Sequence, residues 1–202
     1  KDRYTDLALN QGIELMNNNY FNSGFIDFKV ESVNSTLSDD KEKIYIDINI
    51  SEGIQFKLGK VSFQGELGNQ TPDNLSELLT IKTGDIFNFQ EVVSDIQTIT
   101  DVYTDQGYAF ANINPITKDI LDTVDVNIDI SLNKKVYVNR ITISGNTRTQ
   151  DEVIRREIGI SEGGLYSRSA LRDSVIKLRR LGYFSDVQMS ASKVDDMPDK
   201  ID

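Results

Sequence analysis

The chain has 202 residues, a formal net charge of −10 and a hydrophobic content of 38%, which suffices for two or three small domains with modest cores. It contains no cysteine and no histidine, which excludes a disulfide framework and a Cys/His metal site. The acidic balance disfavours nucleic acid as a main partner. No apolar run approaches the length of about 20 residues that a membrane-spanning helix needs.

The opening segment predicts a helix followed by a strand. Its apolar residues recur at helical spacing, Gly24 stands where a helix C-cap glycine belongs, and residues 25–30 then favour a strand. The expected apolar face of the helix consists of Leu9, Ile13, Met16 and Tyr20.

Two segments alternate strictly between apolar and polar residues. Residues 44–51 place four isoleucines on one side and polar residues on the other, and residues 124–132 repeat this pattern further along the chain. Period two with polar alternates predicts strands with one buried face.

Helix signals follow. Thr71 and Pro72 fit an N-cap with proline at the first helical position, and residues 149–152 fit a capping box, so we expect first helices at 72–79 and 150–158. Apolar stripes at helical spacing then predict second helices, with strands after them at 110–113 and 186–191. The stripes are Val92, Ile96, Ile99 and Tyr103 in one helix, and Leu171, Val175 and Leu178 in the other.

A short pattern recurs three times, as YFNSGF at 20–25, YTDQGY at 103–108 and LRRLGY at 178–183. Repetition at a period of about 80 residues indicates an array of small modules rather than one catalytic body. Each module is expected to follow the order strand–helix–helix–strand–strand, a two-layer α+β unit in which two helices cover one face of a three-stranded sheet. We expect modules at 1–54, 55–134 and 135–202. The first should hold only its second helix and last two strands, and the last should lack its closing strand.

No catalytic constellation stands out. Without histidine or cysteine, a hydrolase would need Ser–Lys or paired carboxylates, and the available acids lie in expected turns, where solvated acids are the norm. They are Asp39, Asp40, Glu52, Asp195 and Asp196. We therefore expect no enzyme activity, no metal and no cofactor. The rival from another functional class is a secreted α+β carboxylate hydrolase, which predicts one concave pocket holding a carboxylate of raised pKa.

Positive charge gathers late in the chain. Residues 134–181 include 11 lysines and arginines against 5 aspartates and glutamates. Such a run is either a set of solvated helix faces or a last module that faces an acidic partner or an anionic membrane surface.

Four stretches carry a family likeness: KIYIDINISEGIQFKLGKVSFQGELG at 43–68, VYVNRITISGN at 136–146, DEVIRREI at 151–158 and LRRLGYFSDV at 178–187. Together they resemble the POTRA repeats of the BamA family of outer-membrane β-barrel assembly proteins. The likeness covers essentially the whole chain, as the end of the third repeat, the fourth and most of the fifth. It implies tandem POTRA-like β-α-α-β-β modules in a scaffold at the periplasmic face of the outer membrane, which binds unfolded barrel precursors and accessory lipoproteins. A TamA-like or two-partner-secretion transporter shares the fold, and the repeat count of the full gene would separate the two.

In POTRA modules the strand after the second helix lies at the sheet edge, where unpaired backbone groups can accept an added strand. The resemblance implies that client precursors add there, and Pro115 would end any added ladder. The expected client residues are Phe110, Ala111, Asn112 and Ile113 in the middle module, and Val187, Gln188 and Met189 in the last. In the first module, the strand that would meet a BamB-like β-propeller lipoprotein comprises Phe28, Lys29, Val30 and Glu31.

The first helix of the last module carries Arg155, Arg156 and Glu157 just before Gly159. In BamA-like proteins this motif lies where the lipoprotein BamD docks, so the resemblance implies Glu157 as the ion-pair member and Arg156 or Arg155 as a flanking contact. The alternative is an exposed helix with local i,i+4 ion pairs, which contribute only about 0.2–0.5 kcal/mol each.

Overall fold

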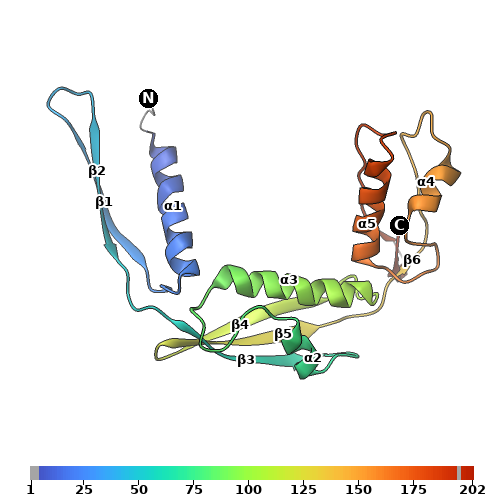
Figure 1. Ribbon diagram of the computed structural model, residues 1–202, viewed down its shortest axis with the longest axis horizontal. Coiled ribbons are helices and arrows are strands. Elements are labelled where there is room, and N and C mark those ends of the chain that lie inside the picture. The colour runs from blue at the N-terminus through green and yellow to red at the C-terminus, as the bar shows by residue number, and fades with distance from the viewer. Residues whose placement is uncertain (1–4, 195–196) are drawn as a thin grey trace. The chain divides into compact units, whose positions relative to one another are not determined.

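The computed structural model describes residues 5–194 and 197–202, and Figure 1 shows their helices and strands coloured along the chain. The helices are α1 (Asp6–Asn22), α2 (Pro72–Glu77), α3 (Phe89–Asp105), α4 (Asp151–Glu157) and α5 (Arg168–Arg180). The strands are β1 (Lys29–Leu37), β2 (Ile44–Ser51), β3 (Lys57–Gly65), β4 (Asn112–Ile120), β5 (Thr123–Ser131), β6 (Tyr137–Val138), β7 (Lys193–Val194) and β8 (Met197–Ile201). They form three sheets, ordered β1-β2, β3-β5-β4 and β6-β8-β7. The mixed α+β class and the order of elements in the middle module confirm the sequence-based expectation.

The residues cluster into two compact units, and each unit is described by itself. The first unit holds residues up to Ser62 with Leu79–Asp95 and Pro115–Ile128, and the second holds Phe63–Leu78, Ile96–Asn114 and Asp129–Asp202. The middle module contributes residues to both units.

The first sheet is a two-stranded antiparallel hairpin, in which Lys29 pairs with Ser51 and Leu37 with Ile44. The four residues predicted for the apolar face of α1 are all half-buried, which confirms the direction of that face, and Asn22 at the end of the helix is half-buried as well. The expected buried face of β2 is not formed, because Ile44 and Ile46 are each 40% exposed. Two strands and one helix bury too little area to cover both faces of a sheet.

The middle sheet has the core that its pattern predicted. In β5 the alternate residues Val124, Val126, Ile128 and Ile130 are buried. In α3, which runs along this sheet (Figure 1), the buried residues include Val92, Ile99 and Tyr103 of the predicted stripe. Burial of a Val, Ile or Phe side chain contributes about 1.5–3 kcal/mol, so these residues hold helix and sheet together.

A buried carboxylate in α3 was not predicted. Asp95 is 1% exposed and its two oxygens accept hydrogen bonds from the amides of Thr80 and Ile81 and from the Thr80 hydroxyl, at 2.8–3.1 Å. Ser174 occupies the corresponding place in α5, where its hydroxyl accepts a 2.8 Å hydrogen bond from the Gly159 amide. In both modules a buried polar side chain of the second helix therefore holds the loop that precedes it.

The last sheet differs from the expectation in two ways. The strand expected at 186–191 is absent, and β7 is confined to Lys193–Val194. The closing strand, expected to be missing, is present as β8, which runs parallel to β6 and antiparallel to β7. Ser192, just before β7, exchanges two backbone hydrogen bonds with Asp202, at 2.8 and 2.9 Å. A cavity of about 530 Å³ lies beside residues 186–191, lined among others by Ile141, Ile143, Leu171, Leu178, Val187 and Met189.

Candidate partner-binding surfaces

β4 lies at an edge of the middle sheet, because the strand order is β3-β5-β4. Asn112 and Ile113 begin this strand and Pro115 lies inside it. Proline is tolerated within a sheet where its nitrogen faces away from the ladder. In an antiparallel strand, alternate residues direct both backbone groups to the same side. The outward side of β4 therefore carries the backbone groups of Ile113, Thr117 and Asp119, which share the parity of Pro115.

Phe110 and Ala111, expected in the client strand, precede β4 and are held in a turn. The Ala111 amide donates to the Tyr108 carbonyl at 3.0 Å, and the Phe110 carbonyl accepts a 2.8 Å bond from the Asn133 side chain. The Lys193 ammonium lies 4.5 Å from the centroid of the Phe110 ring. The open edge is thus displaced toward the C-terminal part of β4.

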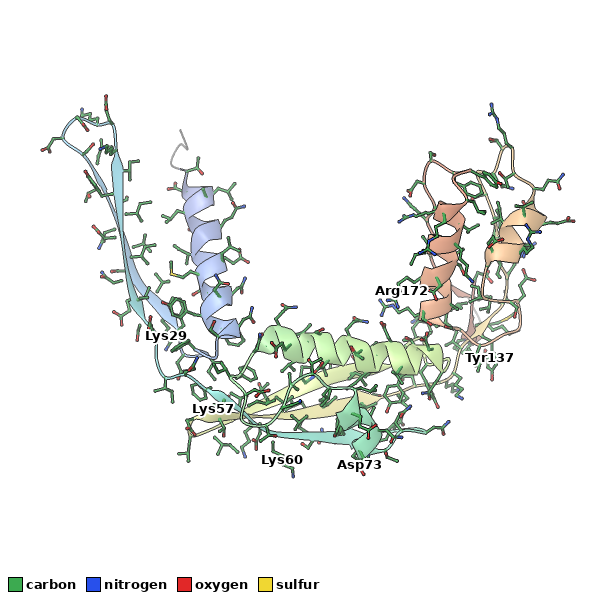
Figure 2. All side chains as sticks on the ribbon, in the orientation of Figure 1. Lys29, Lys57, Lys60, Asp73, Tyr137 and Arg172 are labelled. Atoms are coloured by element: carbon green, nitrogen blue, oxygen red, sulfur yellow. The ribbon has the colours of Figure 1, made fainter. Side chains whose placement is uncertain are left out.

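β1 carries three of the four residues expected to meet a BamB-like partner. Lys29, Val30 and Glu31 lie in the strand, whose start is marked by Lys29 in Figure 2, whereas Phe28 precedes it and stacks on Tyr20 with 4.0 Å between the ring centroids. The pairing with β2 shifts register between Val30 and Ser32. This bulge bends the edge at Glu31 and leaves that residue out of the ladder.

The client residues expected in the last module lie outside any strand. Val187 and Met189 are half-buried and line the cavity described above, and Gln188 is exposed. The Val187 carbonyl accepts a 3.0 Å bond from Arg179. These residues therefore present no strand edge in this structure.

The α4 motif separates into a structural and an exposed part. Arg155 donates to the Ile141 carbonyl at 2.8 Å and lies 3.5 Å from Glu162. The Ile141 amide, which bonds to the Glu162 carboxylate, lowers the pKa of Glu162 with help from Arg155. Arg156 has a 77% exposed side chain and lies 3.7 Å from Glu157, which is 28% exposed. Arg156 is therefore the most exposed residue of the motif and Glu157 is half-buried beside it, whereas Arg155 is held by contacts within its own module.

Part of the positive charge between 134 and 181 is paired within the chain. Arg168 and Arg172 approach Asp101 at 3.8 and 3.6 Å, and Arg179 approaches Asp186 at 3.2 Å. Arg155 is also engaged within its module. These contacts favour the interpretation of the basic region as solvated helix faces with local ion pairs.

A surface that the sequence analysis missed joins successive modules, and it occurs twice. In the first compact unit, the Asn22 side chain at the end of α1 accepts a 3.3 Å bond from the Gln90 amide in the first turn of α3. The Gly24 carbonyl accepts a 2.8 Å bond from the Phe56 amide. We call this set the first junction.

The second junction, in the second compact unit, uses the same positions one repeat later. Asp105 at the end of α3 accepts a 2.9 Å bond from the Ser169 amide in the first turn of α5, and the Gly107 carbonyl accepts a 2.8 Å bond from the Val136 amide. Asn22 and Asp105 each stand two residues before the glycine of the repeated YFNSGF and YTDQGY pattern. This spacing was the signal available in the sequence.

Two of the acids considered for a hydrolase, Asp40 and Glu52, accept hydrogen bonds from side-chain hydroxyls. A hydrogen bond from the Ser38 hydroxyl lowers the pKa of Asp40, opposite to the rise that carboxylate catalysis predicts, and Glu52 accepts a 2.8 Å bond from the Tyr20 hydroxyl. Asp195 and Asp196 lie outside the described residues. In the part of the chain that the structure describes, no cluster of three potential metal ligands occurs. No helix among the same residues has the length and apolarity to cross a membrane.

Comparison with known proteins gives concordant results. A family model described as POTRA, surface antigen variable number repeat, matches residues 1–53, 56–134 and 136–202. The outer membrane protein assembly factor BamA of Neisseria meningitidis is 34% identical over 203 residues, and that of Neorickettsia risticii is 32% identical over 183 residues. These matches cover 100% and 90% of this chain but only 26% and 24% of the relatives. The chain thus spans about a quarter of their length.

Solved structures show the same fold. The crystal structure of Haemophilus influenzae BamA POTRA3-5 matches with a TM-score of 0.78 at 22% identity, covering 100% of this chain and 80% of that one. BamA from Haemophilus ducreyi lacking POTRA domains 1-3 matches with a TM-score of 0.60 at 27% identity, over 73% of this chain and 28% of that one. The matches confirm the resemblance inferred from the sequence, and the first fits its placement at repeats three to five.

Proposed function

We propose that the chain, which belongs to the POTRA repeat family, is a periplasmic scaffold of an outer-membrane protein assembly factor. This scaffold binds barrel precursors by edge-strand addition. The observation that carries this proposal is the edge position of β4, with outward backbone groups on both sides of Pro115. The alternation of lipid-facing and lumen-facing residues in barrel strands gives clients a common period of two. The module bounds expected from the sequence are part of the same proposal.

Backbone pairing suits a receptor for many clients. The backbone hydrogen bonds of the ladder do not depend on side-chain identity, so any extended segment can pair. Side chains at alternate positions of the client only change how well it packs against the module. Four or five hydrogen bonds at about 1 kcal/mol net each give affinities near the millimolar range once association costs are included. Such weak binding allows a client to be released toward the membrane.

Replacing Thr117 with proline tests this site. The change removes one outward N–H of β4 while the ladder to β5 keeps its donors, so we expect binding of an alternating-apolar barrel-strand peptide to weaken about fivefold to tenfold. Titration of the full chain with the peptide, followed by NMR, measures the effect. Thr117→Val keeps the N–H and is the matched control, with unchanged binding expected. Equal binding by the proline variant and the control would exclude β4 as the acceptor.

Docking of a BamD-like lipoprotein on α4 is the second part of the proposal, supported by the exposure of Arg156 and the position of Glu157 beside it. Glu157→Lys is expected to weaken lipoprotein binding at least tenfold, because a like charge then replaces the attractive partner of a basic residue. The control is Glu152→Lys, an equal charge change at an exposed position of the same helix. Calorimetry with both variants measures their affinity for the lipoprotein. An unchanged affinity for Glu157→Lys counts against docking on α4.

The remaining partners follow with less support from geometry. A BamB-like lipoprotein would pair with β1 on its open side, interrupted by the bulge at Glu31. The internal ion pairs of the basic region give an anionic membrane surface no specific support. A TamA-like transporter remains the runner-up within the fold.

A further inference from the structure

The two junctions share their backbone contacts but differ in charge. At the first junction the acceptor is the neutral amide of Asn22, and Phe21 packs edge-on against Phe87 and Phe89 with centroids 6.4 and 5.7 Å apart. At the second junction the acceptor is the carboxylate of Asp105, which also accepts a 2.9 Å bond from the Ser167 hydroxyl.

A second carboxylate reinforces the charged junction. Asp101, one turn before Asp105 on α3, faces Arg168 and Arg172 of α5 at 3.8 and 3.6 Å; Arg172 is labelled in Figure 2. The residue of the first junction that corresponds to Arg168 is Phe89. An aromatic contact at one junction is therefore replaced by an ion pair at the other.

The chemistry of the two acceptors predicts that the hydrogen bond at the second junction is stronger than the one at the first. A carboxylate at the first turn of a helix interacts with the partial positive charge of the helix N-terminus as well as with the N–H groups. Charge-assisted hydrogen bonds are roughly twice as strong as neutral ones. The distance to the acceptor is 2.9 Å at Ser169 and 3.3 Å at Gln90, whose amide also donates to the Asn88 side chain at 3.0 Å.

We propose that the residue two positions before the helix-end glycine is the docking residue between successive modules, and that its charge makes the second junction sensitive to salt and acid while the first is not. The third copy of the pattern has Arg180 at this position, which cannot accept a hydrogen bond. A Cβ added to Gly24 would lie 2.7 Å from the Phe56 carbonyl oxygen, and one on Gly107 would lie 2.7 Å from Leu165 of the next module. The first two copies of the pattern therefore carry a docking acceptor, and the third copy does not.

The acid response has a defined sign. Partial desolvation by the last module raises the pKa of Asp105, which is an exposed residue, but hydrogen bonds from Ser169 and its neighbours outweigh this effect and leave the pKa lowered. The groups around the carboxylate are Asp101 on its own helix, and Tyr166 and Arg168 from the last module. A lowered pKa means that docking is favoured fully above the ordinary aspartate value of about 3.9 and is lost as the pH falls through the docked value.

The test swaps the two acceptor residues, so that each junction carries the acceptor of the other. In the full chain, Asp105→Asn is expected to speed hydrogen exchange at the Ser169 amide about threefold to tenfold at neutral pH and to reduce its salt dependence to the part that the Asp101 ion pairs contribute, with the Gln90 amide unchanged. Asn22→Asp is expected to slow exchange at Gln90 and to make it salt-dependent. Amide exchange by NMR at low and high salt, corrected for the intrinsic rate, gives both readouts.

A structural role without a charge effect gives a different result. If Asp105→Asn keeps the salt dependence of wild type, or if Asp105→Ala leaves the Ser169 amide as protected as before, the proposal is overturned. Unfolding midpoints of the variants show whether faster exchange comes from the junction or from global opening. The outcome is independent of client binding at β4, so it leaves the proposed function untouched in either case.

Discussion

Replacing Asp95 with alanine is expected to destabilise the middle module by about 2–4 kcal/mol. The change removes the acceptor of three hydrogen bonds at once, from the amides of Thr80 and Ile81 and the hydroxyl of Thr80. The Ile81 amide left without a partner costs about 1–3 kcal/mol, because Ile81 is only 8% exposed. Thr80 is exposed, so water replaces the carboxylate for its two donors at a smaller cost. Urea unfolding of the full chain, followed by amide signals of the middle module, measures the loss.

Two further variants separate the causes of this loss. Asp95→Asn keeps one acceptor oxygen and should cost less than half as much. Ser174→Ala removes the corresponding residue of the last module, where one amide donor loses its acceptor, and should cost about 1–2 kcal/mol. If Asp95→Ala were no more costly than Ser174→Ala, the network of Asp95 would not be what holds the loop between α2 and α3.

Replacing Gly65 with alanine is expected to cost a similar amount, about 3–5 kcal/mol. Gly65 ends β3 with φ of 89°, a region in which any residue with a Cβ is strained by about 1–2 kcal/mol. The added Cβ would also collide with the Ile130 carbonyl oxygen, which accepts a 2.8 Å bond from the Glu66 amide. Relief of the collision would break this hydrogen bond. The unfolding midpoint reports the sum of the backbone strain and the lost hydrogen bond.

Gly84→Ala provides the matched control for this prediction. Gly84 has φ of 95°, yet a Cβ placed there meets no atom within 4 Å. It should lose only the conformational contribution of about 1–2 kcal/mol. Equal losses at Gly65 and Gly84 would mean that the close approach to Ile130 is relieved without cost.

Periodicity was sufficient to predict the middle module. The strict alternation of β5 and the helical stripe of α3 both face the core, because the burial of apolar side chains is the largest favourable contribution to folding. Ile96 is the one stripe residue of α3 that is only half-buried. Segment bounds shifted by a few residues where turns compete with strands, as at Phe110 and Ala111.

Burial that depends on a neighbouring layer could not be predicted from one strand. Ile44 and Ile46 of β2 have the pattern of a buried face, but two strands and α1 leave them partly exposed. Asp95 was missed for a related reason, since an acid within an amphipathic helix is usually solvated and only the fold places Thr80 and Ile81 against it.

The candidate sites were predicted in part. The edge position of the strand after the second helix came from family resemblance and is found at β4. The α4 motif was expected to act as a whole, but the backbone of Ile141 and the carboxylate of Glu162 engage Arg155 within the module. The docking acceptors Asn22 and Asp105 lay inside the repeated pattern, where their role depends on contacts that only the folded modules create.

Amide exchange along β4 in the presence of an alternating-apolar barrel-strand peptide tests the central claim most directly. Edge-strand addition predicts that the peptide protects the amides of Ile113, Thr117 and Asp119, which face outward, and leaves the protection of Asn114 and Ile116 unchanged. Peptide binding without new protection on the outward amides, or with new protection confined to another strand, would contradict it.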